Sequence, residues 1–270
     1  MRIVVINLDR DVERLAHMRE QLDGLGLPFE RFSALGGQAL PAWLRGYFVG
    51  CATLSPGEIG CYASHLSICR RIVAGDIASP VLVLEDDVGL PADLPAVLSA
   101  LVRTLPARWD IVRLSYPTKR MTRPIAALGA HHELVRYSHV PTSTGAYLIN
   151  ASGARKFLAP RARRIPIDHD LRRVWAWNLA TFGVAPPPVK ADVFGSSSID
   201  DISPGARANR LRSAAFRRQR AHERIARFKQ GVRDFGFGRW VAIEAANLAG
   251  ALAPRNLRGA FYNWARARVT

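Results

Sequence analysis

Three consecutive acidic residues follow an apolar run and are the sequence feature with the clearest chemistry. Glu85, Asp86 and Asp87 come directly after the apolar residues 81–84. Carboxylate oxygens are the ligands that Mg²⁺ or Mn²⁺ prefers, and such an ion can neutralise the charge that develops on a departing diphosphate. Three acids this close repel one another unless a cation is bound. The sequence predicts a metal site here, and the alternative is an ordinary solvated acidic turn.

Five further side chains could act on a phosphate or on a proton. Arg10 and Arg14 could reach a phosphate from the first loop and helix, and His65 lies near the buried stripe of a later helix. Asp168 and Asp170 follow a Pro-Ile pair, where a carboxylate could serve as a general base. Taken singly, each has an ordinary reading as a helix-face charge, a core histidine or a helix-initiating acid.

The elements that must position these residues alternate between strands and helices. Strands are expected at residues 3–6, 81–84, 110–114 and 145–149. Helices are expected after Asp11, from Pro56 with Ser55 as the cap, around 94–101 and after 152. This order favours an α/β fold, an open sheet flanked by helices whose ligands bind beyond the carboxyl ends of the strands. Residues 115–140 are expected to be irregular, and 183–205 to be a loop or linker.

The positive charge is concentrated at the end of the chain. The 270 residues carry a net charge of +16, and residues 206–270 hold 15 Lys and Arg against three acids. Arginines recur there at helical spacing beside an apolar stripe. The sequence therefore predicts two parts, a domain at 1–205 and a basic amphipathic helical tail at 206–270.

Targeting signals and cysteine patterns give only negative expectations. Four apolar residues at the start are too few for a secretory signal, and no stretch is long and apolar enough to span a membrane, so a cytoplasmic protein is expected. The three cysteines, Cys51, Cys61 and Cys69, form no CxxC pair. Neither a disulfide framework nor a zinc site is predicted from their spacing, and reduced, buried thiols are expected.

Five blocks occur in order along the chain. They are Val-Ile-Asn-Leu-Asp-Arg at 5–10 with Glu13 and Arg14, residues 57–65, residues 83–87, residues 144–149 and residues 166–168. With these blocks the chain resembles the family 25 glycosyltransferases, which include bacterial lipooligosaccharide galactosyltransferases and collagen-modifying enzymes. The resemblance covers residues 1 to about 200 and leaves out the tail. Family members often carry an aromatic residue where Cys69 stands, which bears on the packing of that helix.

The resemblance implies a GT-A-like fold, a UDP-sugar donor and transfer with inversion, with galactose as the expected sugar. On this reading the donor is bound near Asn7, Leu8, Arg10, Arg14, His65 and Asp86. Glu85, Asp86 and Asp87 stand at the family's DxD-like position and would hold Mn²⁺ or Mg²⁺.

The expected reaction is a single in-line displacement, in which a carboxylate opposite the departing UDP deprotonates the acceptor hydroxyl. Asp168 is the leading candidate, because it comes from a separate segment, and Asp170 is the reserve. The expected acceptor is a saccharide or glycolipid of lipopolysaccharide, lipooligosaccharide or another surface glycan.

The tail leaves several hypotheses open. With Trp240, Val241, Ile243 and Leu248 it could lie peripherally on the anionic inner face of the cell membrane, or it could be a solvated extension. Two other classes of function are an inactive transferase-fold binding protein and a nucleic-acid-binding protein that uses the basic tail. No specific nucleic-acid partner is expected, because no known recognition motif accompanies the arginines.

Overall fold

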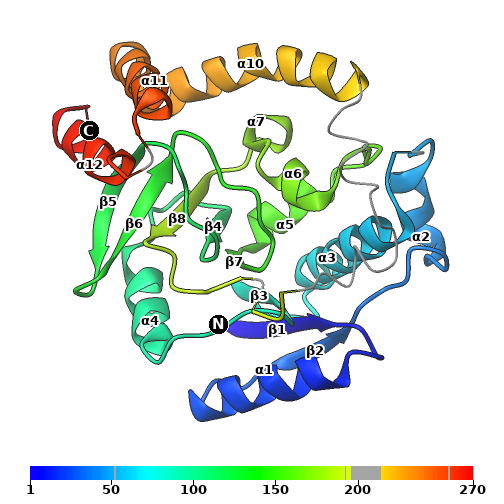
Figure 1. Ribbon diagram of the computed structural model, residues 1–270. Helices are drawn as coiled ribbons and strands as arrows, with labels where there is room; N and C mark the ends of the chain where they lie inside the picture. The colour runs from blue at the N-terminus through cyan, green and yellow to red at the C-terminus, as the bar shows by residue number, and fades with distance from the viewer. Residues whose placement is uncertain (52, 192, 196–213, 255, 270) are drawn as a thin grey trace.

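An eight-stranded mixed sheet with helices on both faces forms the body of the molecule (Figure 1). The computed structural model describes residues 1–51, 53–191, 193–195, 214–254 and 256–269. The strands are β1 (Arg2–Asn7), β2 (Glu30–Ser33), β3 (Val81–Glu85), β4 (Ile111–Arg113), β5 (Thr122–Leu128), β6 (His132–Tyr137), β7 (Ala146–Ile149) and β8 (Thr181–Ala185). The helices are α1 (Val12–Gly24), α2 (Ala42–Arg45), the 3-10 turn η1 (Gly46–Phe48), α3 (Pro56–Ala74), α4 (Leu94–Thr104), α5 (Ala151–Phe157), α6 (Ile167–Leu171), α7 (Val174–Trp177), α10 (Ala214–Phe235), α11 (Phe237–Leu252) and α12 (Arg258–Val269). The expected α/β fold is confirmed and is consistent with the GT-A-like class.

The strand order explains where a ligand can bind. The sheet runs β2-β1-β3-β7-β4-β8-β6-β5. Strands β1, β2 and β3 are parallel, so their carboxyl ends meet at one edge. Strand β7 lies antiparallel between β3 and β4, so its first residues arrive at that same edge. In open α/β sheets this edge is the usual place for a ligand site.

Both faces of the central strands are buried, because successive side chains of a strand point in opposite directions. Val4 and Val83 join the cluster beneath α3 and α5, whereas Val5 and Leu84 join the cluster beneath α1 and α4. The continuous apolar runs read from the sequence are therefore typical of strands covered on both sides.

Helix α3 begins as the sequence predicted. The Ser55 side chain accepts a hydrogen bond from the Glu58 amide, and the Glu58 carboxylate accepts one from the Ser55 amide at 2.8 Å, which together form a capping box. Gly60 contacts the preceding loop so closely that a Cβ there would lie 2.3 Å from the Leu35 carbonyl oxygen. The first turns of α3 are thus fixed in place against residues 34–37.

Two expected loops are partly wrong. Residues 115–140 contain the hairpin β5–β6, in which Leu134 and Val135 are fully buried and pair with β8. Interspersed proline, arginine and histidine hid this alternation in the sequence. The loop expected at 183–205 begins inside β8, and Val189 makes a bridge to Ser115. Its residues 196–205 lie outside the described residues, as does the predicted boundary at 205.

The described part of the tail is helical, as expected, and it packs on the sheet domain. Trp240 and Ile243 of α11 are each 1% exposed and pack with Phe235 and Met121. The Asn247 side-chain oxygen accepts a hydrogen bond of 2.8 Å from the Met121 amide. Burial of Trp240 and Ile243 removes two of the four apolar residues on which the membrane hypothesis rested.

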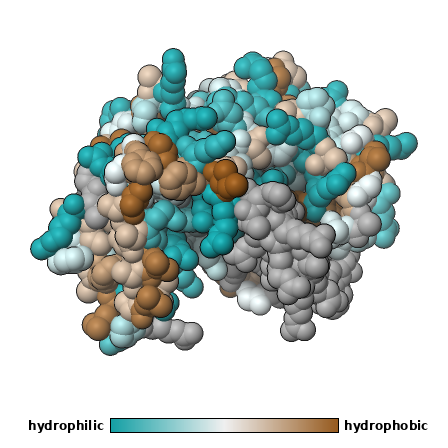
Figure 2. Space-filling model, turned by 90° about the horizontal axis from the view of Figure 1, so that it is seen from above, coloured by the Kyte–Doolittle hydropathy of each residue, from teal (hydrophilic) through white to brown (hydrophobic). Residues whose placement is uncertain are grey.

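The outer face of α11 and α12 still exposes apolar side chains, which gather on the left of Figure 2. They include Val241, Leu248, Leu252, Leu257 and Trp264. None of the described helices is long and apolar enough to cross a membrane. Peripheral membrane binding therefore stays a prediction, now resting on this outer face.

Candidate active site

A cavity of about 390 Å³ lies beyond the carboxyl ends of β1 and β3. Its volume is in the range of small-molecule sites. The walls come from the loop after β1, residues 34–38, the first turns of α3 and the acids after β3. Eight predicted site residues line it, namely Asn7, Leu8, Arg10, Arg14, His65, Glu85, Asp86 and Asp87. The structure therefore brings together all the predicted donor-binding and metal residues.

Asn7 and Arg14 hold the carboxylate of Asp86. The Asn7 side-chain amide donates to one Asp86 oxygen at 2.7 Å, and the Arg14 guanidinium donates to the other at 3.3 Å. Asn7 also accepts from Arg31 and donates to the carbonyl of Asp11, so its amide is engaged inside the protein. Burial raises the pKa of Asp86 despite the opposing effects of Asn7 and Arg14. This arrangement favours a positioning role for Asp86 over direct metal binding.

Asp87 and Glu85 present their carboxylates to the cavity from either side of Asp86. Their side chains are 15% and 28% exposed. Arg14 lies 3.9 Å from Asp87, and the main-chain oxygen of Asp87 accepts a hydrogen bond from the Val193 amide at 2.9 Å. The acidic segment is therefore fixed by its backbone as well as by its side chains.

Glu85 stands beside a buried histidine. The Nε2 atom of His65 lies 3.5 Å from Oε1 of Glu85, at the outer limit of hydrogen bonding, while its Nδ1 atom and the Tyr147 hydroxyl are 2.8 Å apart. Burial by itself would raise the pKa of Glu85, but the interaction with His65 and a hydrogen bond from Thr144 hold that pKa below its ordinary value. Glu85 is thus kept ionised at neutral pH.

Two sets of side chains in this cavity could hold a metal. The carboxylates of Glu85 and Asp87 offer hard oxygen ligands of the kind that suits Mg²⁺ or Mn²⁺. Ligand atoms of Cys61, His65 and Glu85 also lie within 4.8 Å of one another, a mixed set that suits softer ions such as Zn²⁺. The spacing of the cysteines gave no sign of this second set, because His65 and Glu85 join Cys61 only in the folded chain.

The two predicted bases occupy different surroundings. Neither Asp168 nor Asp170 is among the residues that line the cavity. Burial is the largest cause that raises the pKa of the Cys61 thiol, and the charge of Glu85 is the second. The charge of Asp168 is the third, so Asp168 lies near Cys61. Asp168 therefore lies on the α6 side of the acidic cluster.

Asp170 is buried in the packing of the domain. Its carboxylate accepts hydrogen bonds from the Tyr62 hydroxyl at 2.8 Å, from Arg173 at 3.1 Å and from the Trp177 indole at 3.3 Å. Only 2% of the residue is exposed. These contacts favour a structural role for Asp170 over the reserve catalytic role that the sequence predicted.

Arg113 is a charged residue near the site that the sequence interpretation overlooked. It lies on β4, is 1% exposed, and donates one guanidinium hydrogen bond to the Pro141 carbonyl at 3.3 Å. Burial lowers its pKa, and the charges of Asp168 and Glu85 act in the opposite direction, so both carboxylates are nearby. One arginine inside the apolar run 111–114 was the signal that could have revealed it.

Comparison with known proteins agrees with this geometry. The family model for glycosyltransferase family 25, described as an LPS biosynthesis protein, matches residues 1–171. The chain belongs to glycosyltransferase family 25. The match covers every residue placed in the cavity above, and it ends at the last residue of α6.

Three similar proteins show how far the likeness to family 25 members extends. The human inactive glycosyltransferase 25 family member 3 is 32% identical over 167 residues, 60% of this chain and 27% of that protein. Procollagen galactosyltransferase 1 of Danio rerio is 29% identical over 155 residues, covering 56% of this chain and 25% of the relative. A glycosyltransferase 25 family member of Drosophila pseudoobscura pseudoobscura is 30% identical over 185 residues, which cover 63% of this chain and 29% of that protein. This family 25 chain thus matches about a quarter of the length of such relatives.

Proposed function

We propose that this chain transfers a sugar, galactose by its family likeness, from a UDP-sugar to a saccharide acceptor with inversion at the anomeric carbon. The observation that carries the proposal is the cavity beyond β1 and β3, where carboxylates and arginines meet in a family 25 chain. A name among its relatives, procollagen galactosyltransferase, supports the choice of sugar. The surface glycan of the family description supports the class of acceptor.

On the donor side, each side chain has a separate task. Glu85 and Asp87 would hold Mn²⁺ or Mg²⁺, which when bound neutralises the charge of the departing diphosphate. Arg14 reaches the acids from α1 and can add positive charge to the same region. Asn7 and Asp86 keep Arg14 and the loop after β1 in place. The donor would therefore meet a site that is organised before it binds.

The transfer itself needs a base on the side away from the diphosphate. The acceptor oxygen attacks the anomeric carbon, the bond from that carbon to the phosphate oxygen breaks, and its electron pair leaves with UDP. The acceptor's proton passes to the carboxylate of Asp168, which α6 carries near Cys61 and Arg113. The positive charge of Arg113 lies near both Asp168 and Glu85.

An inactive transferase fold that only binds a partner is the main rival. Relatives named inactive favour it. The acids and arginines of the cavity favour activity, because a protein that only binds needs no cluster of repelling carboxylates. Nucleic-acid binding stays a weaker alternative, since the tail that suggested it packs against the domain.

The deciding experiment is UDP release from a panel of UDP-sugars, measured with Mn²⁺, with Mg²⁺ and with EDTA. Metal-dependent hydrolysis of one donor would identify donor and metal together, even without an acceptor. No release from any donor, by protein that unfolds cooperatively on heating, would reject the transferase proposal in favour of the binding protein.

A further inference from the structure

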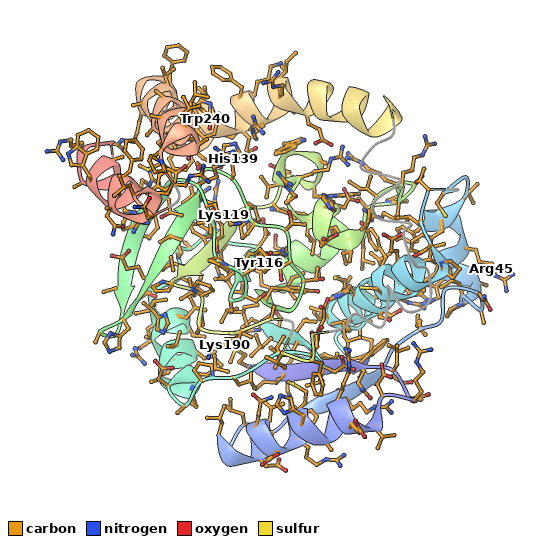
Figure 3. The ribbon with its side chains drawn as sticks, in the orientation of Figure 1. Arg45, Tyr116, Lys119, His139, Lys190 and Trp240 are labelled. Atoms are coloured by element: carbon orange, nitrogen blue, oxygen red, sulfur yellow. The ribbon has the colours of Figure 1, made fainter. Side chains whose placement is uncertain are left out.

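A second cavity, lined by basic side chains, lies between the sheet domain and the tail. It has a volume of about 810 Å³. Its described lining includes the basic residues Lys119, Arg120, Arg172, Arg224 and Arg227, with Glu244 as the one acid among the described residues. We call it the basic cleft. Figure 3 labels Tyr116, Lys119 and His139, which line the cleft along a row running from the middle of the molecule toward α11.

Part of the positive charge in the basic cleft has no acidic partner in the described part of the chain. Among the described residues, no carboxylate lies within ion-pair distance of Lys119, Arg224 or Arg227. His139, whose side chain is 14% exposed, adds no charge at neutral pH, since its partial burial and the arginines around it lower its pKa to about 3. Concave, one-signed surfaces of this kind concentrate anions, and guanidinium groups bind phosphate and carboxylate in pairs of hydrogen bonds.

Tyr116 adds an aromatic ring to the same cleft. It is 44% exposed and has a φ of 69°, a left-handed conformation that is uncommon for an aromatic residue. The preceding Ser115 fixes this conformation, because its hydroxyl contacts Ser143 and accepts from the Ala146 amide, both at 3.0 Å. Strained residues held this firmly are concentrated at ligand sites, and an exposed ring can cover the apolar face of a sugar.

The wall of the basic cleft is joined along the chain to the acidic cluster and to the proposed base. Thr142 lines the cleft and stands three residues before Gly145, whose carbonyl accepts a hydrogen bond of 2.9 Å from the Glu85 amide. Arg172 donates to the Thr142 hydroxyl at 3.3 Å and stands one helical turn after Asp168. The wall of the cleft is therefore continuous with the proposed base.

We propose that the basic cleft binds the acceptor, and that the acceptor is an anionic saccharide carrying phosphate or carboxylate near the sugar that is glycosylated. Tyr116 stacks on a sugar ring, and Arg172, Arg224 and Arg227 bind the anionic group. This inference rests on the proposed transferase function and adds the class of acceptor to it.

The test measures binding of the full chain to a printed array of oligosaccharides, each present with and without a phosphate group, in the absence of donor and metal. The double variant Arg224→Glu and Arg227→Glu is compared with Arg233→Glu and Arg239→Glu, which changes the same charge at exposed tail positions outside the cleft. We expect the wild type and the second variant to retain phosphorylated glycans preferentially. The first variant should bind them about 10- to 100-fold more weakly, because two charge-assisted contacts are lost.

A Tyr116→Ala variant and inorganic phosphate separate the sugar from the anion. Loss of the stacking surface should weaken phosphorylated glycans about 10-fold and leave binding of inorganic phosphate unchanged. Equal retention of neutral and phosphorylated glycans, equal behaviour of the two double variants, or phosphate binding as tight as glycan binding would each overturn the proposal. UDP release by the wild type tests the transferase function separately. A failure of the acceptor proposal can therefore be told apart from a failure of the transferase proposal.

Discussion

The cavity beyond the carboxyl ends of β1 and β3, here called the donor cavity, and the basic cleft differ in how their charges are arranged. In the donor cavity opposite charges lie close together, as Asp86 does to Arg14 and Asp11 does to Arg10. In the basic cleft five basic side chains surround one acid. On the two proposals, the donor cavity receives a ligand together with its cation, whereas the basic cleft receives an anionic ligand.

The two regions also differ in where their residues come from. The donor cavity lies wholly inside the segment matched by the family model, whereas Arg172, Arg224 and Arg227 lie beyond its end. On the proposed function, nucleotide-sugar chemistry is built from the shared part of the chain, and the cleft is built from that part plus the tail. We expect changes in the first region to affect turnover of any substrate, and changes in the second to affect choice of acceptor and stability.

The largest effect is expected for Asp168→Asn. Loss of a general base should lower transfer to an acceptor by about 10²- to 10⁴-fold. Turnover of donor to acceptor, measured as UDP release with a glycan found on the array, provides the measurement. Asp93→Asn, which changes a half-exposed carboxylate on α4's capping residue, is the matched control. Near-normal transfer by a folded Asp168→Asn protein would remove the assignment.

The tail's role in stability comes next. Trp240→Ala should lower the free energy of unfolding by about 3–5 kcal/mol, because it empties a fully buried site between α10 and the domain. Trp264→Ala, at a side chain that is 55% exposed, should cost far less. Urea unfolding followed by circular dichroism compares the two. Indistinguishable midpoints would show that the tail does not pack as described.

Asp87→Asn should lower UDP release by about 10²- to 10³-fold, the usual cost of losing one group that stabilises charge in the transition state. The loss should appear with saturating Mn²⁺, and EDTA should reduce the wild type to a similar level. Isothermal titration of Mn²⁺ supplies a readout independent of turnover. If the affinity for Mn²⁺ were unchanged in this variant, Asp87 would not be a metal ligand.

The smallest effect is a pH dependence that reports on the basic cleft. The pKa of His139 is about 3 in the folded chain and 6.5 in the unfolded chain. As the pH falls below 6.5, His139 therefore takes up a proton in the unfolded chain while it stays neutral in the folded one. The protonation of His139 alone should therefore lower the free energy of unfolding by about 1.4 kcal/mol for each pH unit below 6.5. The groups that face it are Arg120, Arg172, Arg227 and Glu244. His139→Gln should flatten the slope of unfolding free energy against pH, and an equal slope in both proteins would contradict the burial of a neutral His139.

Local signals account for what the sequence could predict. The β-branched run of β1, the Ser55 cap and the acids after β3 are each encoded by adjacent residues, and the rule that ligands bind at carboxyl ends brought eight site residues into one cavity. What the sequence could not show depends on distant partners. Asp170 meets Tyr62 from 108 residues away, and Met121 meets Asn247 from 126 residues away. No spacing in the sequence records such pairs.

The antiparallel direction of β7 sets a fixed length between the two chemistries. Its main chain is bonded to β3 on one side and β4 on the other, and its entry at Gly145 lies beside Glu85. Three residues upstream, the same segment forms the wall at Thr142. On the proposed function, β7 keeps a constant distance between the anomeric carbon of the donor and the anionic group of the acceptor in the basic cleft. Such an enzyme would select which hydroxyl reacts by counting sugar units from the charge, so regiochemistry would follow from sheet geometry rather than from a dedicated pocket for each sugar.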